Sequence, residues 1–211
     1  MISIIAPHEF KHLAWKNGKG VTSELAISDG GDLNNFDWRL SIAGVSEDGG
    51  FSSFPAIQRY LFLLTGQGMK LEHAALDSNE VSVNYLNKPL DLAVFDGGAQ
   101  TYASLANGPI RDFNLMVKSG VIEANVECLT EMSVKELQLA DINFVYPLSD
   151  DCRVMLESQA LDVELQAEHL MRIDSPQAMA SETKRVARVK VQATQAIVIA
   201  LKKVCTNLAS E

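Results

Sequence analysis

The sequence has 211 residues, of which 47% are hydrophobic and 21% charged, and a formal net charge of −9. This composition is that of an ordinary soluble globular protein, long enough for one large domain or two small ones. The charge is spread evenly, with 9 basic and 13 acidic residues up to Gly120 and 9 and 14 after it. Neither half has the basic excess of a nucleic-acid surface, so nucleic acid is excluded as the expected partner.

Neither a secretion signal nor a membrane segment is expected. Residues 1–8 lack a basic segment and have too short an apolar run for a signal peptide. No window approaches the roughly 18 uncharged apolar residues of a transmembrane helix. Cys128, Cys152 and Cys205 are an odd number of cysteines without CxxC spacing, which argues against a disulfide framework or a zinc site. We therefore expect a cytoplasmic protein with reduced thiols and no membrane partner.

Short strand-like segments alternate with strong turn signals along the chain. Asp-Gly-Gly occurs at residues 29–31, 48–50 and 96–98, and each is typical of a turn. Between the turns, apolar or alternating segments predict strands at residues 36–45, 60–65, 69–72, 90–95, 112–118, 121–128, 142–148, 152–157, 161–165, 169–173 and 196–202. Strands at a spacing of about ten residues predict an all-β sandwich or barrel.

Two segments depart from the strand pattern. Residues 132–139 (MSVKELQL) predict the start of a short helix, and the charged residues 181–192 predict a helix or a loop. A weak internal echo relates residues 61–71 to residues 143–156, because each reads as a strand, a turn and a second strand. This echo predicts two tandem β modules, and Gly120 is the predicted boundary between a first domain at 1–120 and a second at 121–211.

Four stretches concentrate the residue types that orient ligands in pockets. They are WKNGKGVTSE at 15–24, WRLSIA at 38–43, GFSSFP at 50–55 followed by Arg59, and DFNLM at 112–116. We expect them to meet in space and to form one site. The residues expected to bind a ligand are Trp15, Asn17, Thr22, Glu24, Arg39, Ser41, Arg59, Asp112 and Asn114.

The two arginines carry most of this expectation. Arg39 and Arg59 lie in or at the start of apolar strands, where a buried guanidinium needs a partner. Two interpretations stay open: a structural ion pair with Glu24 or Asp112, or a bidentate contact with a ligand carboxylate. The Asn114 amide occupies the strand face opposite its apolar neighbours, which favours a pocket wall over a packed core.

Other chemistries are not supported by the sequence. The four histidines, His8, His12, His73 and His169, form no pattern with metal-ligand spacing, and HEFKH at 8–12 lacks the HExxH motif. The sequence contains neither of the glycine-rich phosphate motifs nor GxSxG. No metal, no cofactor and no catalytic residue is therefore assigned.

Taken together, WKNGKGVTSE, WRLSIAGVSEDGGFSSFP, Arg59 and DFNLM resemble the HutD/Ves family, which is associated with bacterial histidine utilisation. The resemblance covers roughly residues 10–120, and the remainder agrees in length and strand rhythm. It implies two cupin-like jelly-roll β-barrels in one chain, with a small-molecule pocket in the first. Metal-dependent cupins usually carry two or three histidines and a glutamate inside the barrel, a set that this chain lacks. Ala56 departs from the glycine that the resemblance implies after Phe54-Pro55.

Three functions are compatible with these features of the sequence. The first is a regulatory protein of histidine utilisation that binds a small anionic metabolite, such as urocanate or formylglutamate. The second is a metal-independent isomerase or lyase that uses Glu24 or Asp112 as acid and base, which requires a pKa raised by burial. The third is a structural or partner-binding protein. The sequence leaves open whether the chain forms a homodimer.

Overall fold

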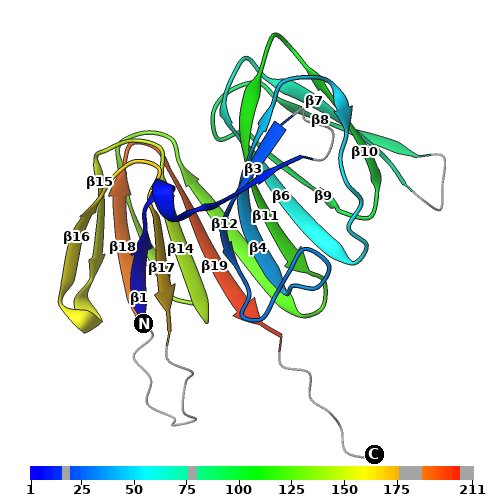
Figure 1. The fold of residues 1–211 in the computed structure, drawn as a ribbon. Coiled ribbons are helices and arrows are strands. Elements are labelled where there is room, and N and C mark those ends of the chain that lie inside the picture. The colour runs from blue at the N-terminus through cyan, green and yellow to red at the C-terminus, as the bar shows by residue number, and fades with distance from the viewer. Residues whose placement is uncertain (16–19, 76–79, 176–186, 205–211) are drawn as a thin grey trace, which may run out of the picture. The chain divides into compact units, whose positions relative to one another are not determined.

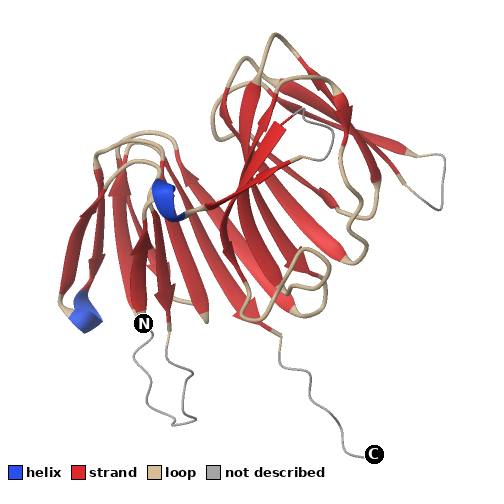
Figure 2. Ribbon diagram, in the orientation of Figure 1, coloured by secondary structure: helices blue, strands red, loops and turns tan. Residues whose placement is uncertain are grey.

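The computed structural model describes residues 1–15, 20–75, 80–175 and 187–204. These residues form β-strands and two short 3-10 helices, η1 (Pro7–Glu9) and η2 (Glu157–Gln159), with no α-helix among them (Figure 2). The all-β prediction is confirmed. Within the same residues, no helix has the length and apolar character needed to cross a membrane.

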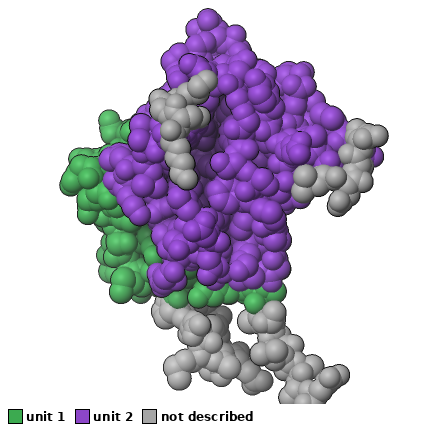
Figure 3. All heavy atoms as spheres, turned by 45° about the vertical axis from the view of Figure 1, so that its right-hand side comes forward, with its two compact units in different colours: residues 1–9, 123–211 green, residues 10–122 purple. Residues whose placement is uncertain are grey.

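The chain divides into two compact units, coloured separately in Figure 3. We call residues Phe10–Ile122 the N-terminal unit, and Met1–Glu9 with Glu123–Glu211 the C-terminal unit. The division falls two residues after the predicted boundary at Gly120. The first nine residues belong to the C-terminal unit because β1 (Ile2–Ile5) pairs with β17 (Leu170–Asp174), an arrangement that no local signal encodes.

The N-terminal unit consists of two antiparallel sheets, in the orders β2-β3-β4-β11-β6-β9 and β5-β10-β7-β8 (Figure 1). Its strands are β2 (Lys11–Ala14), β3 (Gly20–Ile27), β4 (Trp38–Val45), β5 (Gly49–Gly50), β6 (Ile57–Thr65), β7 (Met69–Ala74), β8 (Val81–Leu86), β9 (Leu92–Asp96), β10 (Gln100–Leu105) and β11 (Ile110–Lys118). Apolar residues from both sheets, including Leu61 and Leu71, form one core between them. Burial alternates along β7, whereas most residues of the central strands β4 and β11 are buried.

The C-terminal unit also has two antiparallel sheets, in the orders β1-β17-β14-β19-β12 and β13-β18-β15-β16 (Figure 1). Its remaining strands are β12 (Ile122–Leu129), β13 (Ser133–Gln138), β14 (Ile142–Pro147), β15 (Cys152–Leu156), β16 (Leu161–Leu165), β18 (Arg188–Ala193) and β19 (Ala196–Lys203). Val145 and Val191 are among the residues that form its core between the sheets. The closure of each unit into a jelly-roll barrel stays a prediction.

Two predicted departures from strand structure are wrong. Of residues 132–139, expected to begin a helix, 133–138 form β13. Of residues 181–192, expected to be helix or loop, 188–192 belong to β18, and 181–186 lie outside the described residues. The two strands pair along their whole length, for example Leu137 with Val189. Val189 belongs to the core of the C-terminal unit and Leu137 packs against it. Pairing and burial therefore make these segments strands, although their local sequences favour a helix or a loop.

The tight turns depend on residues with positive φ. Gly66 and Gly68, in the turn between β6 and β7, have φ of 109° and 111°. An added Cβ at Gly66 would lie 2.5 Å from a side-chain atom of Ile110. Ala56 has φ of 60°, a left-handed conformation that costs an L-residue about 1–2 kcal/mol. The family resemblance implies glycine at Ala56, and the backbone there explains that preference.

Candidate functional site

The strand register of the six-stranded sheet brings predicted site residues together. Glu24 on β3 lies opposite Ser41 on β4, and Ser41 lies opposite Asn114 on β11. Arg39 on β4 and Arg59 on β6 both lie opposite Met116 of β11, which runs between these two strands. Because side chains alternate between the faces of a strand, these residues share one face of the sheet.

This polar face is the inner face of the sandwich. Leu61, which lies opposite Asn114, and Leu63, which lies opposite Asp112, both belong to the core between the two sheets. Asp112 therefore joins the same face. The structure thus brings polar residues from all four stretches into a mostly apolar interior, where polar atoms need partners.

Arg39 is held by a buried ion pair. Its Nε donates to Glu24 Oε2 over 2.7 Å, and its Nη1 lies 3.4 Å from Ser41 Oγ. The Arg39 and Glu24 side chains are only 6% and 11% exposed. Of the two interpretations of Arg39, the ion pair with Glu24 is therefore present in this structure.

Arg59 is buried with incomplete hydrogen bonding. Its guanidinium carbon lies 4.8 Å from the centre of the Phe51 ring and 5.1 Å from that of Phe95. Nη1 lies 3.5 Å from the carbonyl oxygen of Ser52, whereas Nε has no hydrogen-bond partner among the described residues. Burial lowers the pKa of Arg59 to about 10, and the negative charge of Asp112 partly opposes that shift.

Asp112 and Asn114 also carry buried oxygens without partners. Neither Asp112 Oδ2 nor Asn114 Oδ1 accepts a hydrogen bond within the part of the chain that the structure describes. Burial raises the pKa of Asp112 to about 7, against the opposing attraction of Arg59. A buried polar atom without a hydrogen-bond partner costs about 1–3 kcal/mol of folding free energy. Asp112 Oδ2, Asn114 Oδ1 and Arg59 Nε are therefore suited to hydrogen-bond a ligand.

Trp15 and Thr22 lie at the edge of the same region. The Trp15 indole Nε1 donates to Thr22 Oγ1 over 2.7 Å, and the ring contacts the core between the sheets. An added Cβ at Gly20 would lie 3.0 Å from the Trp15 ring. Trp15 is thus fixed by its neighbours. Asn17, the remaining predicted site residue, lies outside the described residues.

His73 was not predicted as part of the site. It projects inward from β7 in the four-stranded sheet, and its ring stacks on Phe95 at a centroid distance of 4.3 Å. Nδ1 lies 2.9 Å from Thr101 Oγ1, and Nε2 lies 3.0 Å from Asn84 Oδ1. Burial lowers the pKa of His73, and the charge of Arg59 lowers it further. The alternation Met69-Leu71-His73 could have indicated that this histidine faces inward.

The residues of this face do not fit a metal ion. Among the described residues, no group of three or more His, Cys, Asp or Glu is placed to hold one. Both nitrogens of His73 already have partners, and Glu24 already accepts from Arg39. The donor set differs from the histidine cluster that metal-dependent cupins use.

Comparison with known proteins identifies the family. The sequence profile of HutD matches residues 7–193. The chain belongs to the HutD family. Members of the HutD family are associated with histidine utilisation, and the resemblance inferred from the four stretches is confirmed.

One sequence relative and two solved structures are closely similar. An uncharacterised 21.2 kDa protein in the hutC 3′ region of Pseudomonas putida is 39% identical over 115 residues, which span 54% of this chain and 57% of the relative. A conserved protein of unknown function from Pseudomonas aeruginosa PAO1 has a TM-score of 0.81 and 27% identity, covering 96% of this chain and 99% of that one. HutD from Pseudomonas fluorescens SBW25 has a TM-score of 0.77 and 28% identity over the same shares.

More distant structures share the fold alone. Oxalate decarboxylase from Lactobacillus farciminis has a TM-score of 0.63 at 8% identity, covering 94% of this chain and 85% of that enzyme. This neighbour is cupin-like, which agrees with the cupin-like fold expected for the HutD family. An identity this low carries no information about activity.

Proposed function

We propose that this HutD-family protein is a cytoplasmic regulatory protein of histidine utilisation that binds a small carboxylate metabolite in its N-terminal unit. The observation that supports the proposal is the environment of Arg59, a buried cation that contacts two aromatic rings and whose Nε lacks a partner among the described residues. A carboxylate is the natural acceptor for such a guanidinium. The partner is therefore a small anionic metabolite.

The unpartnered oxygens of Asp112 and Asn114 restrict which carboxylates could bind beside Arg59. Asn114 Oδ1 needs a donor, and a carboxyl group at Asp112 with a pKa near 7 can accept or donate a hydrogen bond. A ligand that carries both a carboxylate and an N–H group can satisfy Arg59 and these two residues at once. Urocanate, with its imidazole, and formylglutamate, with its amide, both have these groups and are our leading candidates.

Arg39 and Glu24 act as supports in this proposal. Their mutual ion pair holds both side chains beside Ser41. The ligand is therefore bound by Arg59, Asp112 and Asn114. Trp15 and Thr22, at the edge of this region, hold each other in place through their own hydrogen bond. A site built on the strands of a rigid sheet holds its groups in place before the ligand arrives, which reduces the ordering cost of binding.

Thermal melting with a panel of anions tests the proposal. Urocanate, formylglutamate, histidine and an unrelated dicarboxylate are added to the wild type, to Arg59→Ala and to Arg153→Ala, a control that removes an exposed arginine. A ligand at about 100 times its Kd stabilises the folded protein by roughly 2.7 kcal/mol. We expect urocanate or formylglutamate to raise the Tm of the wild type and of Arg153→Ala, and to leave that of Arg59→Ala unchanged.

Two outcomes of that experiment contradict the proposal. Equal shifts for every anion indicate general charge effects and no specific pocket. The absence of any shift at millimolar ligand favours the structural or partner-binding function. Circular dichroism of Arg59→Ala before melting separates loss of binding from loss of fold.

Asp112 supports a second candidate function. A buried carboxyl group with a pKa of about 7 is suited to general acid–base catalysis near neutral pH. The alternative is therefore a metal-independent isomerase or lyase with Asp112 as acid and base, while Glu24 is committed to Arg39. NMR of urocanate or formylglutamate incubated with the protein decides the matter: turnover that disappears in Asp112→Asn supports an enzyme, and unchanged substrate supports a binding protein.

A further inference from the structure

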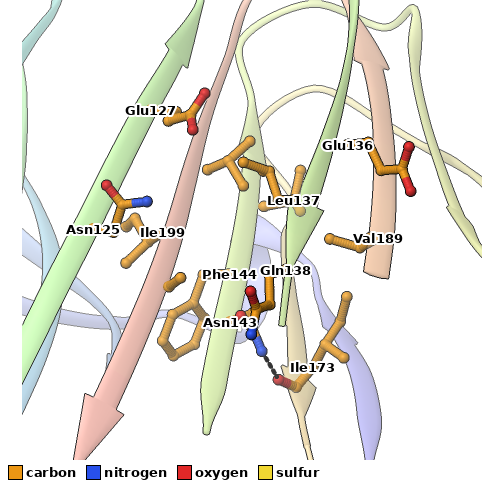
Figure 4. Close-up of a pocket in the computed structure, with 13 residues that line it drawn as sticks. Asn125, Glu127, Glu136, Leu137, Gln138, Asn143, Phe144, Ile173, Val189 and Ile199 are labelled. Atoms are coloured by element: carbon orange, nitrogen blue, oxygen red, sulfur yellow. Dashed lines mark hydrogen bonds between the residues drawn. The ribbon is translucent and has the colours of Figure 1, made fainter. Parts of the chain in front are cut away.

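A separate cavity of about 280 Å³ lies within the C-terminal unit. Strands of both sheets line it, with Asn125 and Glu127 from β12, Leu137 from β13, Asn143 from β14 and Val189 from β18 among its walls (Figure 4). It is independent of the Arg59 region, which belongs to the N-terminal unit.

The cavity arises where the inner strand faces change from large apolar to polar or small residues. On β12, Leu129 belongs to the core, and Glu127, two residues earlier, has the same inward parity. On β14 the core residue Val145 is likewise preceded by Asn143. On β19 the core residue Val198 is followed at the same parity by Ala200, which is small. The sandwich is therefore less filled at this end.

Asn143 is part of the fixed wall. Its Oδ1 accepts from the Ala140 backbone N–H over 2.9 Å, and its Nδ2 donates to the carbonyls of Ala140 and Ile173 over 3.0 and 3.1 Å. The last of these bonds is drawn in Figure 4. Because both ends of this amide already have partners, the polar side chains left to contact an occupant include those of Asn125 and Glu127, on β12 of the same sheet.

The charged side chains that line the cavity are acidic, and each pairs with a basic neighbour outside the lining: Glu136 Oε1 lies 3.2 Å from Arg188 Nη1, and Glu127 pairs with Lys135. The charged residues among those lining the cavity are Glu127 and Glu136, and the lining includes no basic side chain. Glu127 lies 3.2 Å from Lys135 Nζ, in a pair whose side chains are 32% and 52% exposed. An ion pair this accessible is weak and leaves its carboxylate available to a second cation.

We propose that this cavity binds a small organic cation: a protonated amine attached to an apolar body. The apolar walls at Leu137, Val189 and Val198 accommodate the body, while the Glu127 carboxylate pairs with the ammonium group and Asn125 orients it. The volume lies just below the 300–1,000 Å³ of pockets for drug-sized ligands, so a single ring with a short amine arm fits. This preference is opposite in sign to that of the N-terminal site.

Three probes with the same ring and different charge test the proposal: benzylamine, benzyl alcohol and benzoate. Each is titrated into isotope-labelled protein, and amide chemical shifts report both the affinity and the location. We expect benzylamine to shift resonances of β12, β13 and β14 and to bind at least tenfold more tightly than benzyl alcohol. Benzoate is expected to leave those resonances unchanged.

Two matched variants give opposite expected changes. Glu127→Gln keeps the shape and removes the charge, so benzylamine affinity falls about fivefold or more, whereas Glu123→Gln, an exposed residue of β12 outside the cavity lining, leaves it unchanged. Lys135→Gln removes the competing ammonium, so benzylamine binds more tightly. The same titration in Arg59→Ala is expected to match the wild type, which separates this site from the proposed function.

Three results overturn the proposal. Equal affinity for benzylamine and benzyl alcohol indicates an apolar void without charge recognition. Unchanged benzylamine affinity in a folded Glu127→Gln removes the assigned role of the carboxylate. The absence of benzylamine-induced shifts in β12 to β14, in both the wild type and Lys135→Gln, shows that the cavity does not bind amines.

Discussion

Replacing Arg39 by alanine is expected to destabilise the N-terminal unit strongly. The Arg39 Nε lies 2.7 Å from Glu24 Oε2, and both side chains are almost fully buried. The substitution leaves the Glu24 carboxylate in the interior without its cation, and breaking a buried pair in this way costs about 3–5 kcal/mol. With a urea m-value of about 2 kcal/mol/M, the unfolding midpoint falls by about 2 M.

Urea unfolding followed by circular dichroism and by tryptophan fluorescence measures this loss. Arg153→Ala is the matched control, because Arg153 donates to Asp162 over 2.6 Å in a pair that is about half exposed. The control midpoint is expected to change little, since solvent screens exposed pairs. The double variant Arg39→Met/Glu24→Leu removes both buried charges and is expected to recover most of the stability.

A similar, small shift of the urea midpoint in Arg39→Ala and Arg153→Ala would refute the stabilising role of the buried Arg39–Glu24 pair. It would show that the guanidinium of Arg39 is solvated and that Glu24 does not depend on it. A double variant as unstable as Arg39→Ala would instead show that the loss comes from packing around the arginine stem and not from the unpaired carboxylate.

The remaining predictions concern one carboxyl group, one thiol and one backbone position. Burial raises the pKa of Asp112 from 3.8 to about 7 in the folded protein, so its contribution to stability is full below about pH 4 and is lost as the pH rises through 7. The urea midpoints at pH 5 and pH 8 should therefore differ more in the wild type than in Asp112→Asn. Equal differences in the two proteins would contradict this. Burial raises the pKa of Cys152 to about 12, so in a Cys128→Ser/Cys205→Ser background its reaction with a thiol reagent at pH 8 should be slow until urea unfolds the C-terminal unit. Fast labelling of the folded protein would refute its burial. Ala56→Gly relieves a residue at φ of 60° and is expected to raise the Tm slightly, with a fall in Tm as the contrary result.

Local sequence patterns predicted much of the fold because alternation and turn chemistry are short-range signals. The predicted apolar segment 60–65 lies in β6, and the Gly66-Gln67-Gly68 turn connects β6 to β7. Segments whose conformation depends on distant partners were missed. Strand β13 is charged and exposed along most of its length, and its pairing with β18 supplies what its own sequence does not indicate.

The sequence predicted which residues belong to the candidate site better than it predicted which of them contact one another. A charged residue inside an apolar strand, such as Arg39 or Arg59, needs a buried partner, but sequence alone could not choose between Glu24, Asp112 and a ligand. The register of the sheet decides it for Arg39 by placing Glu24 within 2.7 Å. His73 was missed because its partners come from β8 and β10, far along the chain.

Ligand binding at Arg59 is tested most directly by a crystal structure of the protein soaked with urocanate or formylglutamate at a concentration that raises its Tm. The proposed function predicts ligand density in the N-terminal unit, with a carboxylate oxygen within about 3 Å of Arg59 Nε and a ligand donor facing Asn114 Oδ1. An ordered ligand bound elsewhere, with Arg59 Nε still lacking an acceptor, would contradict it.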